Sequence, residues 1–164
     1  MKKTIIFFLA MISISCNSQK FSDKALATTL LSLDGSQISF QDILKKHDSK
    51  TVLIEVWASW CGDCVKNMPN LKKLQANNPS VDYLFLSMDK TADKWKEGIE
   101  KHDLKGDHFM ANDGMKGIFG KALDIDWIPR YIILNKSGEI VLLRAIETDF
   151  DKVNETLLEL EKNK

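Results

Sequence analysis

The sequence predicts an α/β domain with a central mixed β-sheet and helices on both faces. Residues 51–57 (TVLIEVW) and 81–88 (VDYLFLSM) read as buried strands, and each is followed by a helical pattern, which requires a parallel crossover. Residues 131–135 and 139–145 flank a Lys-Ser-Gly turn, which indicates an antiparallel hairpin. A chain of 164 residues, 44% hydrophobic and 28% charged, suits one packed domain.

The first residues predict export. Residues 1–15 have a basic start and a short apolar core, the layout of a secretory signal, and the core is shorter than the roughly 20 residues that span a bilayer. Cys16 follows directly and resembles the lipidated cysteine of bacterial lipoproteins, although Ser13 stands where leucine is usual; ordinary signal cleavage is the alternative. We expect a lipid anchor on Cys16, a flexible tether over 16–28 and a folded domain over 29–164.

The other elements follow in order along the chain. Two short extended pieces flank an Asp34-Gly35 turn. Apolar spacing predicts helical segments at residues 41–47, 62–76, 91–102, 114–123 and 149–162. Residues 101–109 (KHDLKGDHF) are expected to form polar loop surface, and the three histidines, His47, His102 and His108, to face solvent. Net charge is zero with both signs interspersed, so no nucleic-acid surface is indicated.

Two cysteines stand where the first buried strand gives way to a helix. The amino end of a helix presents unpaired amides and partial positive charge, which stabilise a thiolate, so Cys61 is expected to be the attacking and more exposed thiol. Cys64, one turn further, would be more buried and would resolve a mixed disulfide. Glu55 is the candidate base, because a carboxylate in an apolar strand should have a raised pKa. The alternative is that Glu55 points to solvent at a strand end.

The segments EVWASWCGDC and IDWIPRYIILNKSGEIV resemble the thioredoxin superfamily. The longer layout, with LDGSQISFQDI before the first strand and an extra helical stretch before Pro129, resembles the TlpA/ResA branch of membrane-tethered thiol-disulfide oxidoreductases. The resemblance covers residues 29–164 and implies a thioredoxin-like fold. It implies no organic cofactor and no metal.

The resemblance also implies roles for single residues. Cys61 matches the nucleophile, Cys64 the resolving cysteine and Glu55 the buried acid. Pro129 matches the cis-proline that faces the disulfide, and Ile128 would offer backbone hydrogen bonds to an extended substrate. The implied substrate-binding residues are Trp60, Gly62, Asp63, Ile128 and Pro129.

Partners and location follow from the same resemblance. Substrates would be protein disulfides, apocytochromes c among them, and electrons would come from a membrane-embedded thiol donor. The chain would work in the periplasm or at the extracytoplasmic face of a membrane, attached through its lipid anchor. The sequence fixes neither the oligomeric state nor the net direction of electron flow.

Two positions depart from the family pattern. Asp63 occupies the place where proline is usual, and its negative charge should oppose thiolate formation and bias the pair toward reducing. The other view is that Asp63 favours the helix start through the helix dipole. Asn67 stands where similar reductases carry a functional glutamate, and because an amide cannot titrate, their pH-switch behaviour is not expected here.

Three other functions fit the residues less well. Cys61 and Cys64 have the spacing of a zinc or copper ligand pair, but 37 residues separate Cys64 from His102, far more than in a zinc finger. A peroxidase of the same fold would usually have threonine where Ala58 stands. A purely structural disulfide would close a loop too short to constrain much chain entropy.

Overall fold

The computed structural model describes residues 19–162. It contains one seven-stranded mixed sheet with strand order β2-β1-β5-β4-β3-β6-β7. The strands are β1 (Thr29–Ser32), β2 (Gln37–Ser39), β3 (Val52–Trp57), β4 (Asp82–Ser87), β5 (Asp107–Met110), β6 (Arg130–Leu134) and β7 (Ile140–Ala145). The helices are α1 (Asp23–Ala27), α2 (Phe40–Lys45), α3 (Gly62–Asn77), α4 (Ala92–His102), α5 (Ile118–Ala122), the 3-10 turn η1 (Glu147–Asp149) and α6 (Phe150–Lys162).

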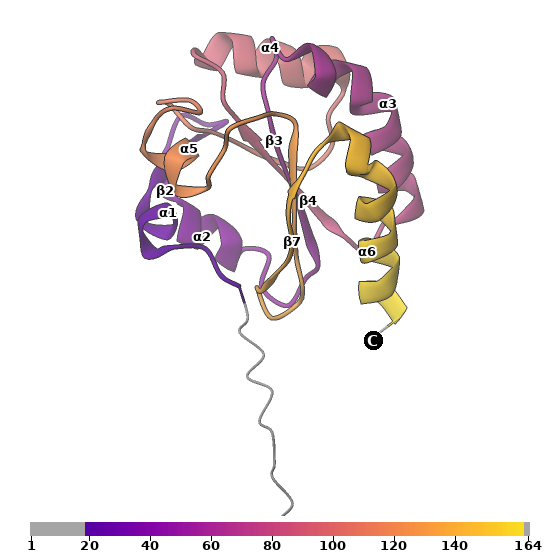
Figure 1. Ribbon diagram of the computed structural model, residues 1–164. Coiled ribbons are helices and arrows are strands. Elements are labelled where there is room, and N and C mark those ends of the chain that lie inside the picture. The colour runs from indigo at the N-terminus through magenta and orange to yellow at the C-terminus, as the bar shows by residue number, and fades with distance from the viewer. Residues whose placement is uncertain (1–18, 163–164) are drawn as a thin grey trace, which may run out of the picture.

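Helices cover both sides of the sheet, as predicted. In Figure 1, α3 and α6 lie on one side of the strands and α1, α2 and α5 on the other, while α4 lies across the top of the view. On the second side, the ring of Phe40 from α2 packs edge-on against Phe119 from α5, with centroids 5.1 Å apart. The predicted α/β class with a mixed sheet is therefore confirmed.

Strand β3 occupies the interior of the sheet. All six of its residues are buried, and it pairs in parallel with β4 and antiparallel with β6. A strand that is covered on both faces and hydrogen-bonded along both edges has almost no freedom to move. The end of β3, and the segment that leaves it toward α3, are therefore held in a fixed place.

The expected polar loop at residues 101–109 was wrong in its second half. Residues 107–110 form β5, which pairs in parallel with β4 and antiparallel with β1. His108 is buried and stacks on Phe85 of β4, with ring centroids 4.8 Å apart. The strand is short and begins with charged Asp107, so it lacks the apolar run that marks β3 and β4; pairing on both edges buries it nonetheless.

The solvent-facing prediction was also wrong for His47. This side chain is buried, and its Nδ1 lies 2.8 Å from Oδ2 of Asp82. Both buried histidines thus have structural contacts far along the sequence, which no local pattern reveals. Across residues 19–162, no group of three or more His, Cys, Asp or Glu side chains is arranged to hold a metal ion.

The folded domain also begins earlier than residue 29. The amide of Ile140 donates to the carbonyl of Gln19, Phe21 packs edge-on against Phe40, and Ala25 of α1 is fully buried. The expected tether over 16–28 is therefore wrong from residue 19 onward. A few apolar residues among polar ones suffice to dock this segment.

The proposed signal over residues 1–15 and Cys16 lie outside the described residues. Between residues 19 and 162, no helix is both long and apolar enough to pass through a membrane.

The contact between α4 and the segment after β3 gives a stability prediction. A Cβ added at Gly98 would lie 2.7 Å from the Cβ of Ser59 and 3.1 Å from the ring of Trp57. Gly98→Ala should therefore lower the free energy of unfolding by about 1–3 kcal/mol, measured by urea denaturation. Gly62→Ala is the matched control, because nothing lies within 4 Å of its added Cβ. Equal stability of both variants and the wild type would contradict this packing.

Candidate active site

Cys61 and Cys64 form a disulfide at the amino end of α3. Cys61 is the N-cap of the helix, its Cα lies 5.3 Å from that of Cys64, and the amide of Cys64 donates to Sγ of Cys61 at 3.1 Å. The sulfur of Cys61 thus occupies the position where a capping oxygen usually satisfies a free helix amide. In the reduced protein the same amide and the helix dipole favour the Cys61 thiolate.

The two sulfurs differ in access. Cys61 borders a hollow of about 350 Å³, whereas Cys64 is fully buried and does not border it. The predicted order of exposure is therefore confirmed. Of the two sulfurs, only that of Cys61 belongs to a residue that lines the hollow.

The loop before β6 closes the other side of the hollow. The Ile128–Pro129 peptide bond is cis, as the resemblance implied, and the carbonyl oxygen of Ile128 lies 3.5 Å from Sγ of Cys61. The residues that line the hollow are Trp60, Cys61, Gly62, Asp63, Met115, Asp126, Trp127 and Ile128. Four of the five predicted substrate-binding residues thus share one cavity, and the fifth, Pro129, is next to Ile128 in the chain.

The hollow has an apolar character. Trp60 and Trp127 keep 59% and 50% of their surface exposed, which is unusual for large aromatic side chains. Together with Met115 they offer an apolar surface beside the reactive sulfur. Met115 and Asp126 were not predicted, because only the fold brings them next to Cys61.

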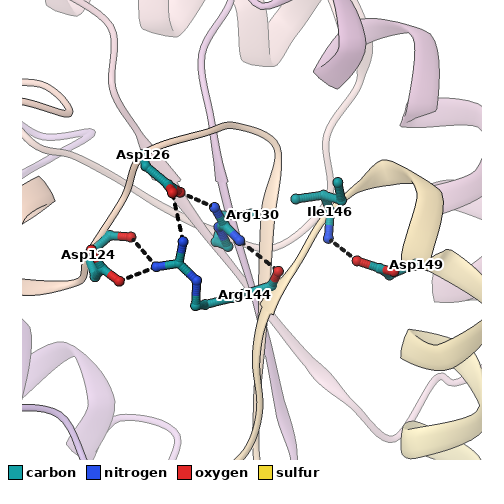
Figure 2. Close-up of polar contacts among 6 residues, drawn as sticks. All are labelled: Asp124, Asp126, Arg130, Arg144, Ile146 and Asp149. Atoms are coloured by element: carbon teal, nitrogen blue, oxygen red, sulfur yellow. Dashed lines mark hydrogen bonds and ion pairs between the residues drawn. The ribbon is translucent and has the colours of Figure 1, made fainter.

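Two arginines and two aspartates form a cluster that holds the loop before β6. In Figure 2, Arg144 binds Asp124 and, at 2.7 Å, Asp126, while Arg130 binds Asp126 and the carbonyl oxygen of Arg144, the latter at 2.6 Å. The same view shows the carboxylate of Asp149 accepting from the amide of Ile146 where the chain turns into α6. Residues 124–128 are thereby tied to β6 and β7. The two arginines are fourteen positions apart in the sequence, so no local pattern reveals this pairing.

Asp89 holds the segment between β3 and Cys61. Its buried carboxylate accepts from the amide of Ser59 at 3.0 Å, from the hydroxyl of Ser59 at 2.7 Å and from the hydroxyl of Ser87 at 2.8 Å. The sequence carried a usable signal that was missed. Asp89 follows the carboxyl end of β4, beside the end of β3, where parallel strands gather functional groups.

Glu55 lies inside the protein, and its alternative placement in solvent is excluded. Its side chain is only 2% exposed, and burial raises its pKa from the ordinary 4.5 to about 8, while the hydroxyl of Tyr131 acts in the opposite direction as a hydrogen-bond donor. Glu55 and Tyr131 are partners across β3 and β6, so their side chains project from the same face of the sheet.

The contacts of Tyr131 identify the face of the sheet from which Glu55 and Tyr131 project. Nδ2 of Asn67, on α3, donates to the Tyr131 hydroxyl at 2.8 Å. Asn67 is three residues beyond Cys64, on the same side of the helix. Glu55 therefore lies in the layer between the sheet and α3, the layer into which Cys64 is also buried.

The sequence is similar to those of known proteins. Residues 48–140, which run from before β3 to the start of β7, match the family described as thioredoxin-like. The thiol-disulfide oxidoreductase ResA of Bacillus cereus is 27% identical over 111 residues, which cover 66% of this chain and 60% of ResA. A protein disulfide-isomerase of Ricinus communis is 26% identical over 103 residues, covering 62% of this chain and 20% of the isomerase.

Solved structures agree on the architecture. A Bacteroides vulgatus protein provisionally assigned as a thiol-disulfide oxidoreductase superposes with a TM-score of 0.69 at 29% identity, covering 92% of this chain and 95% of its own. A thiol-disulfide oxidoreductase of Bacteroides fragilis superposes with a TM-score of 0.66 at 23% identity, covering 85% and 98%. The chain spans about three fifths of ResA and one fifth of the isomerase.

The buried carboxyl predicts how stability depends on pH. Between pH 4.5 and about 8 the folded protein retains a proton on Glu55 that the unfolded chain releases, so stability should fall as pH rises through this window. The slope attributable to Glu55 approaches about 1.4 kcal/mol per pH unit. Urea denaturation of the disulfide form at pH 5, 6, 7 and 8 measures it.

Glu55→Gln should remove this slope and raise stability at pH 8, because the amide carries no charge at any pH. Glu155→Gln, at an exposed position on α6, is the matched control and should keep the slope of the wild type. Identical pH profiles for the wild type and Glu55→Gln would contradict a buried, titrating Glu55.

Proposed function

The chain belongs to the thioredoxin-like family, and from this premise we propose that it is a thiol-disulfide oxidoreductase that reduces protein disulfides. The observation that carries the proposal is the asymmetry of the cysteine pair. Cys61 caps α3 and borders an open hollow, while Cys64 is buried and lies within bonding distance of Cys61. This arrangement allows one sulfur to attack and the other to resolve.

The reaction then runs in two exchange steps. In the reduced protein, the Cys61 thiolate attacks a substrate disulfide, forms a mixed disulfide and releases one substrate thiolate. Cys64 loses its proton and attacks Sγ of Cys61, which closes the Cys61–Cys64 disulfide and releases the second substrate thiolate. Two electrons pass to the substrate, and an outside thiol donor must reduce the protein again.

Glu55 is the proposed proton acceptor for Cys64. Its pKa of about 8 means that, near neutral pH, it is present in both protonation states and exchanges a proton readily. Cys64 has no access to water, so a group within the protein has to take its proton. Glu55 occupies the buried layer where that group is needed.

Asp63 is the proposed source of a reducing bias. It lies at the rim of the hollow, on the turn between the two cysteines, and its side chain is exposed. Its negative charge opposes the negative charge of the Cys61 thiolate. A less stable thiolate makes the reduced form a better donor of electrons.

Location and partners extend the same proposal. The signal-like residues 1–15 support export, and Cys16 supports a lipid anchor. The similarity to ResA, a thiol-disulfide oxidoreductase, supports protein disulfides as substrates. Apocytochromes c are candidate substrates, and a membrane-embedded thiol protein is the candidate electron donor.

Trapping tests the assigned roles of the cysteines. Cys64→Ser should accumulate a stable mixed disulfide between Cys61 and a model disulfide peptide, detected as a mass adduct under non-reducing conditions. Cys61→Ser should form none, because the buried Cys64 cannot reach the substrate. An adduct of similar yield on Cys61→Ser would contradict the assignment.

The charge of Asp63 gives a kinetic prediction. Asp63→Asn should raise the rate of Cys61 alkylation by iodoacetamide near pH 7 by about two- to fivefold, the effect of removing one exposed charge several ångströms from the thiolate. Asp93→Asn, which removes an exposed acid in the first turn of α4, is the matched control and should leave the rate unchanged. An unchanged or lower rate for Asp63→Asn would contradict the proposed bias.

A further inference from the structure

A chain of hydrogen bonds runs beneath α3 and ends at Tyr131, the cross-strand partner of Glu55. Nδ2 of Asn70 donates to Oδ1 of Asn67 at 2.8 Å, and Nδ2 of Asn67 donates to the hydroxyl of Tyr131 at 2.8 Å. Asn67 is 6% exposed and Tyr131 is fully buried, so neither side chain relies on water for these contacts. Buried polar groups that are mutually satisfied hold one orientation.

The direction of these bonds decides what the Tyr131 hydroxyl can do. An amide NH2 group only donates, so the hydroxyl oxygen must be the acceptor from Asn67. The single hydroxyl proton is then left for another acceptor. Glu55, the cross-strand partner of Tyr131, supplies that acceptor, and the hydrogen bond from Tyr131 favours the charged form of its carboxyl.

Groups from neighbouring elements surround Glu55 and Tyr131. Phe85 of β4 stands beside Glu55 in the sheet, and the ring of Phe150 from α6 packs edge-on against Tyr131 with centroids 5.5 Å apart. From α3 come Cys64 and Asn67. Glu147 of η1 acts on Tyr131 through its charge and not through a hydrogen bond.

We propose that Asn67 and Tyr131 are positioning residues for Glu55: Asn67 orients the Tyr131 hydroxyl so that it donates to the Glu55 carboxylate. The inference rests on the proposed role of Glu55 in the oxidoreductase reaction. Burial alone holds a carboxyl in its protonated form, and a protonated Glu55 cannot accept a proton from Cys64. A fixed donor stabilises the carboxylate and keeps it available at neutral pH.

The inference also gives a reason for an amide at position 67. An acid there would accept the hydroxyl proton of Tyr131 and turn it away from Glu55. It would also add a second negative charge to the same buried layer. Asn67 avoids both effects while satisfying Tyr131 and Asn70.

The test is a carboxyl titration of Glu55 by 13C NMR in the disulfide form, in which neither Cys61 nor Cys64 titrates. Tyr131→Phe removes the donor, so the Glu55 protonation equilibrium should shift about tenfold toward the protonated form, a rise of about one pH unit in its midpoint. Asn67→Asp should raise the midpoint at least as far. An unchanged midpoint in both variants would overturn the proposal.

Tyr83→Phe is the matched control for loss of a buried hydroxyl. Tyr83 bonds only to the carbonyl oxygens of Leu74 and Asn78, so its loss should destabilise the fold without moving the Glu55 midpoint. A shift in Tyr83→Phe as large as in Tyr131→Phe would mean that loosened packing is responsible, and would overturn the proposal. Asn67→Asp keeps the titration informative if Tyr131→Phe does not fold.

Kinetics separate this inference from the proposed function. In stopped-flow measurements, Tyr131→Phe should move the pH midpoint of mixed-disulfide resolution upward by about one unit, and leave the initial attack by Cys61 unchanged. Equal shifts in both steps would overturn the inference but leave the oxidoreductase function standing. Failure of the wild type to form any mixed disulfide would overturn the function, and the NMR titration would still decide whether Asn67 and Tyr131 orient Glu55.

Discussion

The site depends on the confinement of β3 in the middle of the sheet. This strand pairs with β4 and β6 along its two edges and is covered on both faces. Its end is therefore held in one position. That end leads through Ser59, fixed by Asp89, to Cys61 at the start of α3. A redox cysteine needs such support because its reactivity depends on a helix amide a few ångströms away.

Burial in the same strand destabilises the charged form of Glu55. A carboxyl group in the interior loses its hydration, and the raised pKa is the measure of that loss. In the proposed arrangement, the hydroxyl of Tyr131 offsets part of this loss by donating to the carboxylate, and Asn67, which donates to that hydroxyl, orients it. Cys64 and Glu55 thus share one buried layer between the sheet and α3, while Cys61 borders the hollow.

Sequence patterns predicted the elements whose signal is local. The apolar runs of β3 and β4, the position of Cys61 before a helix, and the isolated charge of Glu55 are each visible within a few consecutive residues. The cis bond before Pro129 came from the family resemblance and not from spacing. Features that depend on distant pairing were missed: β5 is buried only because β1 and β4 flank it, and residues 19–28 dock through scattered contacts such as Phe21 on Phe40. The arginine and aspartate cluster behind the Ile128 loop was missed for the same reason.

The central claim is that Cys61 and Cys64 form a reversible, reducing dithiol–disulfide pair, and a redox titration of the protein tests it most directly. The protein would be equilibrated in thiol–disulfide buffers of known potential, its free thiols trapped by alkylation, and the number of trapped thiols counted by mass. The account predicts a two-thiol transition at or below about −250 mV, close to the potential of thioredoxin. A transition near about −120 mV, as in a strong disulfide donor, or the absence of any reversible transition, would contradict it.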